Sequence, residues 1–217
     1  MNINEIIDCG KTDRSRFNES FLRESPQRHD PAEYFDPLNY IINDYMSKGA
    51  NKTFVSTING FDLFKLDFKI TVYYWFELNN NPLLIIELEK KNRSLVVNLL
   101  GKKGKGLPYA VDLYTGILND TNKSVTITSD NQITEKGLNV WKRLFDQGHK
   151  ITVYDTSNVG PTWRMLSFSN DLELYFGDDV KYKNYRYVLS ESTFANDTKS
   201  FFMLRQIREE SGSALED

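Results

Sequence analysis

The apolar residues of this chain recur with a helical period in one stretch and with a strand period in the next. Residues 37–49 carry apolar side chains three and four positions apart, and Gly49 is a suitable C-cap, so we expect a helix there. Between 53 and 100, β-branched and aromatic residues dominate, and short polar turns such as Asn59-Gly60 separate the runs. This pattern predicts four or five consecutive antiparallel strands.

After residue 101, helical and strand patterns alternate. Residues 108–118 and 134–148 have the spacing of amphipathic helices, and strand-like runs occupy 125–129 and 150–155. Further short strand-like runs follow in MLSF, DLELYF, NYRYVL and FFMLRQI. The order predicts an α+β domain with a mixed, mostly antiparallel central sheet, flanking helices and extra C-terminal strands.

The two ends of the chain differ in composition from its middle. Residues 1–37 carry many charges, three prolines and few aliphatic side chains, which is typical of a polar arm. The segment 208–217 is polar and acidic, and we expect it to fray. We therefore expect one folded domain over 38–207 and an arm at 1–37 that orders on a protein partner.

The charge balance excludes several classes of function. The 217 residues include 27 Lys and Arg and 30 Asp and Glu, so the chain lacks the basic field typical of proteins that bind nucleic acid or anionic membranes. The longest apolar run, LLII, is far too short to span a membrane, and the first residues do not resemble a signal peptide. One Cys and two His exclude a disulfide framework and a Cys/His zinc site. We expect a cytoplasmic protein.

One loop concentrates positive charge that the net charge hides. It lies between a predicted strand and a predicted helix, and Pro108 suits the first position of that helix. Glycines allow successive N–H groups to turn toward an anion, which a helix N-terminus also favours. The loop predicts a site for a small phosphorylated ligand, against the alternative of a solvated turn. Its residues are Gly101, Lys102, Lys103, Gly104, Lys105, Gly106 and Leu107.

The strand, the loop with Gly104 and Gly106, and the helix, strand and helix that follow resemble the GNAT superfamily of acyl-CoA-dependent N-acyltransferases, over residues 53–155. In that family the loop Q/R-x-x-G-x-G/A binds the pyrophosphate of acyl-CoA, and the preceding strand binds the pantetheine arm. The resemblance implies that Leu99 and residues 101–107 bind acetyl-CoA or another acyl-CoA. It also implies that strand 95–100 splays from its neighbour and that an acyl group passes from the thioester to an amine.

Two positions depart from the family's pattern. Gly101 stands where Gln or Arg is usual, and Phe145 stands where many members have a Tyr that protonates the leaving thiolate. His149 and Tyr154 are candidates to replace it, and the catalytic residue stays unassigned. The stretch 129–155 resembles phage-encoded members. An alternative is therefore a catalytically silent protein of this fold that binds a partner, in the host cytoplasm or in a phage virion.

A third hypothesis is a Mg²⁺-dependent nuclease. The apolar strand LLIIELEKK ends in Glu87, Glu89 and Lys91, and Asp62 or Asp67 would supply a further acid. In such nucleases the carboxylates hold Mg²⁺ and the Lys positions the attacking water. The ordinary explanation of the pattern is a polar strand end that faces solvent. In an acyltransferase, Glu87 would instead be a candidate general base.

Overall fold

The computed structural model describes residues 31–130, 133–157, 162–177 and 180–190. The strands are β1 Thr53–Ile58, β2 Phe61–Asp67, β3 Thr71–Leu78, β4 Asn81–Lys91, β5 Ser94–Lys102, β6 Thr126–Thr128, β7 Lys150–Asp155, β8 Thr162–Met165 and β9 Tyr185–Ser190. The helices within the described residues are α2 Pro31–Ser47, α3 Ala110–Asp120 and α4 Glu135–Asp146, with 3₁₀ helices η2 Ser169–Tyr175 and η3 Val180–Asn184.

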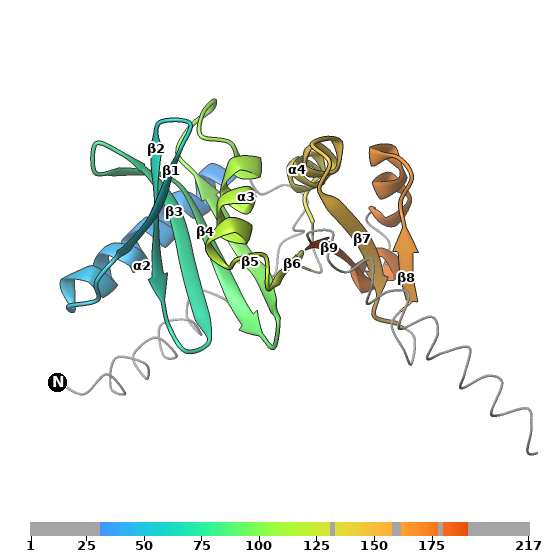
Figure 1. Cartoon of the computed structure of the whole chain (residues 1–217), viewed down its shortest axis with the longest axis horizontal. Helices are drawn as coiled ribbons and strands as arrows, with labels where there is room; N and C mark the ends of the chain where they lie inside the picture. The colour runs from blue at the N-terminus through green and yellow to red at the C-terminus, as the bar shows by residue number, and fades with distance from the viewer. Residues whose placement is uncertain (1–30, 131–132, 158–161, 178–179, 191–217) are drawn as a thin grey trace, which may run out of the picture.

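One mixed sheet joins the nine strands in the order β1-β2-β3-β4-β5-β6-β9-β7-β8. The pair β5–β6 is parallel, and the other neighbouring pairs are antiparallel. The crossover between the two parallel strands carries α3, as a parallel connection requires (Figure 1). The predicted α+β class, with its mostly antiparallel sheet and additional C-terminal strands, is confirmed.

The strand meander follows from its turns. Asn59 and Gly60 both have positive φ, of 51° and 82°, which is the conformation that a two-residue hairpin turn needs. Asn79 and Asn80 do the same between β3 and β4, with φ of 50° and 62°. Asparagine and glycine tolerate this region better than other residues, so the sequence determines where these strands reverse.

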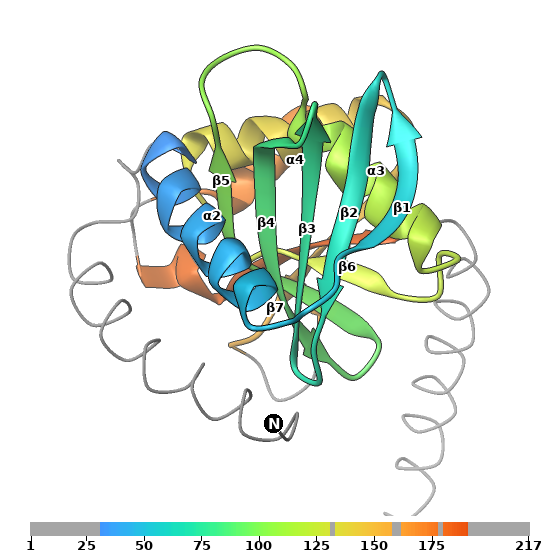
Figure 2. The same cartoon turned by 90° about the vertical axis from the view of Figure 1, so that its left-hand side faces the viewer.

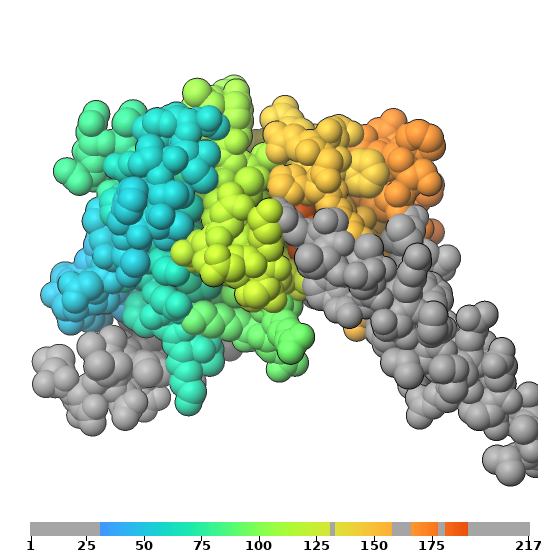
Figure 3. All heavy atoms as spheres, viewed as in Figure 1, coloured from blue at the N-terminus to red at the C-terminus, as the bar shows by residue number. Residues whose placement is uncertain are grey.

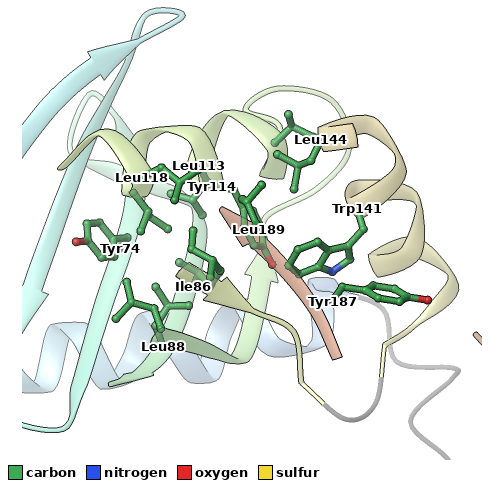
Figure 4. Close-up of a cluster of buried hydrophobic side chains, with 14 of the residues drawn as sticks. Tyr74, Ile86, Leu88, Leu113, Tyr114, Leu118, Trp141, Leu144, Tyr187 and Leu189 are labelled. Atoms are coloured by element: carbon green, nitrogen blue, oxygen red, sulfur yellow. The ribbon is translucent and has the colours of Figure 1, made fainter. Parts of the chain in front are cut away.

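Two hydrophobic cores lie on the two faces of the sheet. On one face α2 buries Phe35, Leu38 and Ile42 against residues such as Trp75 and Ile85. On the other face α3 and α4 cover the larger core (Figures 2 and 4). Both faces of β3 are therefore covered, and its residues from 71 to 77 are all buried.

Helix α2 begins earlier than the sequence predicted. It starts at Pro31, with Pro37 inside it, and Phe35 is 4% exposed. The boundary of the arm at residue 37 was therefore wrong, because residues 31–37 belong to the folded domain. Charged residues between the apolar positions hid the periodicity of this first turn. The arm from 1 to 30 lies outside the described residues.

The predicted strand DLELYF is a 3₁₀ helix, η2. Leu172 is fully buried, Leu174 is 69% exposed and Tyr175 is half-buried, which fits a period of three and not of two. The predicted run FFMLRQI and the tail 208–217 lie outside the described residues. Within the described part of the chain, no helix combines the length and the apolar character needed to cross a membrane.

Candidate ligand cavity

The sheet opens between its two parallel strands. Residues Ser94–Val96 of β5 pair with Thr126–Thr128 of β6, and β6 ends there. β5 continues to Lys102 with β4 on one side and no described strand on the other. Strand 95–100 therefore loses its pairing with β6 from residue 97 onward, and its expected splay to admit a ligand stays a prediction.

A β-bulge accompanies the opening. The register between β4 and β5 shifts between Glu87 and Leu88, which face Leu99 and Val97, so Asn98 is the extra residue. A bulge bends its strand and increases the local twist. β5 thus bends at the point where its pairing with β6 ends.

A cavity of about 500 Å³ lies at this opening. Its walls are residues 97–100 of β5, the first turns of α3 and one side of α4. Tyr34 reaches it from the face that α2 covers, and Tyr114 and Trp141 reach it from the face of α3 and α4. The cavity therefore extends through the sheet and contacts both faces.

Among the described residues, three cations line the cavity, one at the end of β5 and two on α4. Lys102, Lys136 and Arg143 line the cavity, whereas Lys103 and Lys105 are exposed and lie outside its lining. Burial lowers the pKa of Lys102, and the charge of Arg143 lowers it further. Of the three lysines in the predicted loop, the structure thus places one at the cavity.

The Lys102 ammonium bonds across the glycine loop. Its Nζ donates a hydrogen bond to the carbonyl oxygen of Gly106 and lies 5.5 Å from the ring centroid of Tyr109. The loop between β5 and α3 protrudes at the top of the molecule, with α4 beside it (Figure 3). Gly104 and Gly106 have φ of 75° and 90°, so both positions require the left-handed conformation that glycine tolerates.

Two residues of the predicted loop, and the proline that follows it, have other surroundings than expected. Gly101 is a buried residue of β5, where a Cβ would lie 2.7 Å from the Cα and N atoms of Phe35, so its role is close contact with α2. Leu107 is 53% exposed and does not line the cavity. Pro108 precedes the N-cap Tyr109, so it is not the first helical residue as predicted.

The lining of the cavity includes several apolar side chains and two buried donors. Val97, Leu99 and Val111 line it, together with Tyr114 and Trp141, whose ring centroids lie 5.7 Å apart. Tyr114 is 4% exposed and Trp141 is 3% exposed. Neither the Tyr114 hydroxyl nor the Trp141 Nε1 has a hydrogen-bond partner in the described part of the chain.

The candidate acids from the sequence lie elsewhere. Phe145 packs against the larger core, and His149 Nε2 lies 3.3 Å from Thr115 Oγ1. Tyr154 is on β7, opposite Arg186 of β9. None of Phe145, His149 and Tyr154 lines the cavity. Sequence reasoning missed Tyr114, because a Tyr at an apolar position of an amphipathic helix looks like an ordinary core residue.

The carboxylates of the nuclease hypothesis do not gather. Glu87 accepts a hydrogen bond from Asn98 Nδ2 at 3.1 Å, and Glu89 pairs with Lys91 at 3.0 Å. Asp67 pairs with Lys90. In the described ranges no three His, Cys, Asp or Glu residues are grouped so that they could hold a metal ion. The geometry thus gives the nuclease hypothesis no support.

Comparison of the chain with protein-family models, with curated proteins and with solved structures gave no match in any of the three.

Proposed function

We propose that this protein is an acyl-CoA-dependent N-acyltransferase that binds its thioester substrate in the cavity beside β5. The observation that carries the proposal is the loss of strand pairing after Val96, with a cavity at that place and a glycine loop leading into α3. This is the arrangement that the resemblance to the GNAT superfamily implies, and the topology of the sheet supports it.

The chemistry of the walls matches the parts of such a ligand. Lys102 and Arg143 suit a pyrophosphate, and the N-terminus of α3 adds its dipole and unpaired N–H groups. The open edge of β5 offers backbone groups to the amides of a pantetheine arm, and apolar side chains on either side contact its methylene groups. An elongated ligand with one anionic end and an apolar arm fits these walls.

The direction of β5 orients the ligand. Lys102 is at the loop end of the strand, and the sheet closes again at Val96. A ligand with its pyrophosphate at Lys102 therefore extends back along residues 97–100, and its acyl group reaches the region of the bulge. The amine acceptor enters from the opposite side of the sheet. Its nitrogen bonds to the acyl carbon, the C–S bond breaks, and the proton lost by the nitrogen is taken up by the thiolate.

Calorimetric titration with acetyl-CoA tests the proposal. A ligand present at 100 times its Kd raises the free energy of unfolding by about 2.7 kcal/mol, so a thermal shift provides a second readout. Lys102→Met removes one of the cations that line the cavity and keeps the aliphatic stem of the side chain. We expect it to weaken binding about tenfold or more. The matched control is Lys103→Met, which removes an exposed charge outside the cavity lining and should leave the affinity within about twofold.

Filling the cavity is an independent test. Ala110 lines it on the first turn of α3, so Ala110→Trp should abolish binding. Asn119 is exposed near the other end of the same helix, and Asn119→Trp is the control. No binding of millimolar acetyl-CoA by the unchanged protein would refute the proposal. Binding without transfer to any amine would instead support a silent protein of this fold.

A further inference from the structure

The hydroxyl of Tyr114 is an unsatisfied hydrogen-bond donor on a residue that lines the cavity. Tyr114 is on the second turn of α3, is 4% exposed, and lines the cavity. Its side chain extends from α3 toward the Trp141 ring (Figure 4). Within the described residues no group accepts a hydrogen bond from this hydroxyl.

Other buried tyrosines of the same core have partners. The Tyr187 hydroxyl donates to the Leu172 carbonyl at 2.8 Å, and the Tyr74 hydroxyl donates to the Asp120 carboxylate at 2.7 Å. Buried polar groups in folded proteins are nearly always satisfied, and leaving one without a partner destabilises the fold. A Phe at position 114 would fill the same space without this penalty. The hydroxyl is thus better explained by a ligand that accepts its hydrogen bond.

The surroundings restrict what this hydroxyl can do. Burial raises the pKa of Tyr114 above the ordinary value of tyrosine. The phenol therefore stays protonated at neutral pH, so it acts as a hydrogen-bond donor and not as a base. A donor in an apolar site interacts most strongly with an acceptor that gains negative charge during the reaction.

We infer that the Tyr114 hydroxyl donates a hydrogen bond to the thioester carbonyl oxygen of the bound acyl-CoA, an inference that rests on the proposed function. A carbonyl oxygen accepts hydrogen bonds well, whereas a thioester sulfur accepts them weakly. In the proposed complex the amides of the pantetheine arm bond to the edge of β5 that β6 leaves unpaired. As the amine attacks, the carbonyl oxygen becomes an oxyanion, and the bond from Tyr114 stabilises it. The phenol missing at position 145 thus has a counterpart on α3, with a different role.

The test compares two ligands on two proteins. Acetyl-CoA has the carbonyl, and the thioether S-ethyl-CoA has the same length without it. We expect Tyr114→Phe to weaken acetyl-CoA binding about tenfold, which is 1.4 kcal/mol, and to leave S-ethyl-CoA binding within about twofold. Equal affinities of the variant and the unchanged protein for acetyl-CoA would overturn the inference. Equal losses for the two ligands would overturn it as well, because the carbonyl would then not be the acceptor.

The stability of the free proteins is a second readout that does not depend on the ligand. Tyr114→Phe removes no hydrogen bond within the described residues, so its melting temperature should equal or exceed that of the unchanged protein. Tyr187→Phe is the matched control: it loses the bond to Leu172, so it should melt at a lower temperature and bind acetyl-CoA normally. A clear fall in the melting temperature of Tyr114→Phe would indicate a partner within the protein and refute the inference.

The two proposals fail in different ways. If the unchanged protein does not bind acetyl-CoA, the acyltransferase function and the role of Tyr114 are both refuted. If it binds acetyl-CoA and Tyr114→Phe binds equally well, the function stands and the role of Tyr114 is refuted.

Discussion

Replacing Gly101 by Ala tests whether this glycine supports α2 or binds a ligand. A Cβ at position 101 would lie 2.7 Å from Phe35 Cα and N and 2.8 Å from Tyr34 C. All three are backbone atoms, so no side-chain rotation relieves the overlap. To reach an ordinary contact of 3.4 Å, α2 and β5 must separate by about 0.7 Å, and α2 is held against the sheet by Leu38 and Ile42, which are both fully buried.

The expected cost follows from this displacement. Overpacking a close contact destabilises a protein by about 1–3 kcal/mol, and each fully buried side chain such as Phe35 contributes about 1.5–3 kcal/mol that a displaced helix partly loses. The lower backbone entropy of Ala in the unfolded chain offsets about 0.4–1 kcal/mol. We therefore expect Gly101→Ala to lower the free energy of unfolding by about 2 kcal/mol, or the melting temperature by about 4–8 °C.

Urea denaturation followed by tryptophan fluorescence measures this change, because Trp75 lies in the core beneath α2. The control is Gly116→Ala on α3, where a Cβ would lie 2.7 Å from Leu63 Cδ2 and 2.9 Å from Ile58 Cδ1. These are ends of flexible side chains that can turn away, and Ala favours the helix by about 1 kcal/mol, so we expect little net change. Unchanged stability of Gly101→Ala together with weaker acetyl-CoA binding would refute the packing role.

Three further predictions concern other interactions of the fold. Asp120→Ala leaves Lys65 Nζ and the Tyr74 hydroxyl without the carboxylate that accepts from them at 2.6 and 2.7 Å, so urea denaturation should show a loss of about 1–3 kcal/mol. Burial and then Asp120 raise the pKa of Tyr74, so the unfolded chain loses this proton first as the pH rises. The stabilisation that comes from Tyr74 is therefore complete below about pH 10 and falls above it. In urea denaturation above about pH 10, the free energy of unfolding of Tyr74→Phe should fall by about 1.4 kcal/mol per pH unit less than that of the unchanged protein. Thr134→Ala removes the side-chain acceptor of the Gly137 N–H at 3.0 Å and should cost about 0.5–2 kcal/mol, measured by thermal denaturation and restored in Thr134→Ser.

The cavity gives a physical meaning to the low net charge of the chain. Lys102, Lys136 and Arg143 all line one cavity, and the charges of Lys102 and Arg143 interact there, although the chain as a whole is slightly acidic. A polymer such as DNA needs charge spread over a long surface, whereas a small anionic group needs it at one point. The distribution therefore fits a compact phosphorylated group better than a nucleic acid.

Local patterns in the sequence determined the turns and strands whose conformation depends mainly on neighbouring residues. The turn residues Asn59 and Gly60 reverse the chain because positive φ is easiest for Asn and Gly, and the β-branched run that became β3 has no other regular conformation as favourable. The glycine loop before α3 was found in part, because Gly101 and Lys102 belong to β5. Its two left-handed positions, Gly104 and Gly106, are a backbone property that glycine makes visible in the sequence.

Tertiary structure alone decided which residues face the cavity. Lys102 lines it and Lys103 does not, although their surroundings in the sequence are nearly identical, because Lys102 is the last residue of β5 and bonds back to the Gly106 carbonyl, whereas Lys103 lies in the exposed loop that follows. Gly101 resembles a loop glycine until α2, more than sixty positions earlier, is placed against it. Tyr114 has the pattern of a core residue, and its missing partner becomes visible when α3, α4 and the sheet come together. Contacts between distant segments are not encoded in any local window, so a sequence predicts the elements and the fold selects the site.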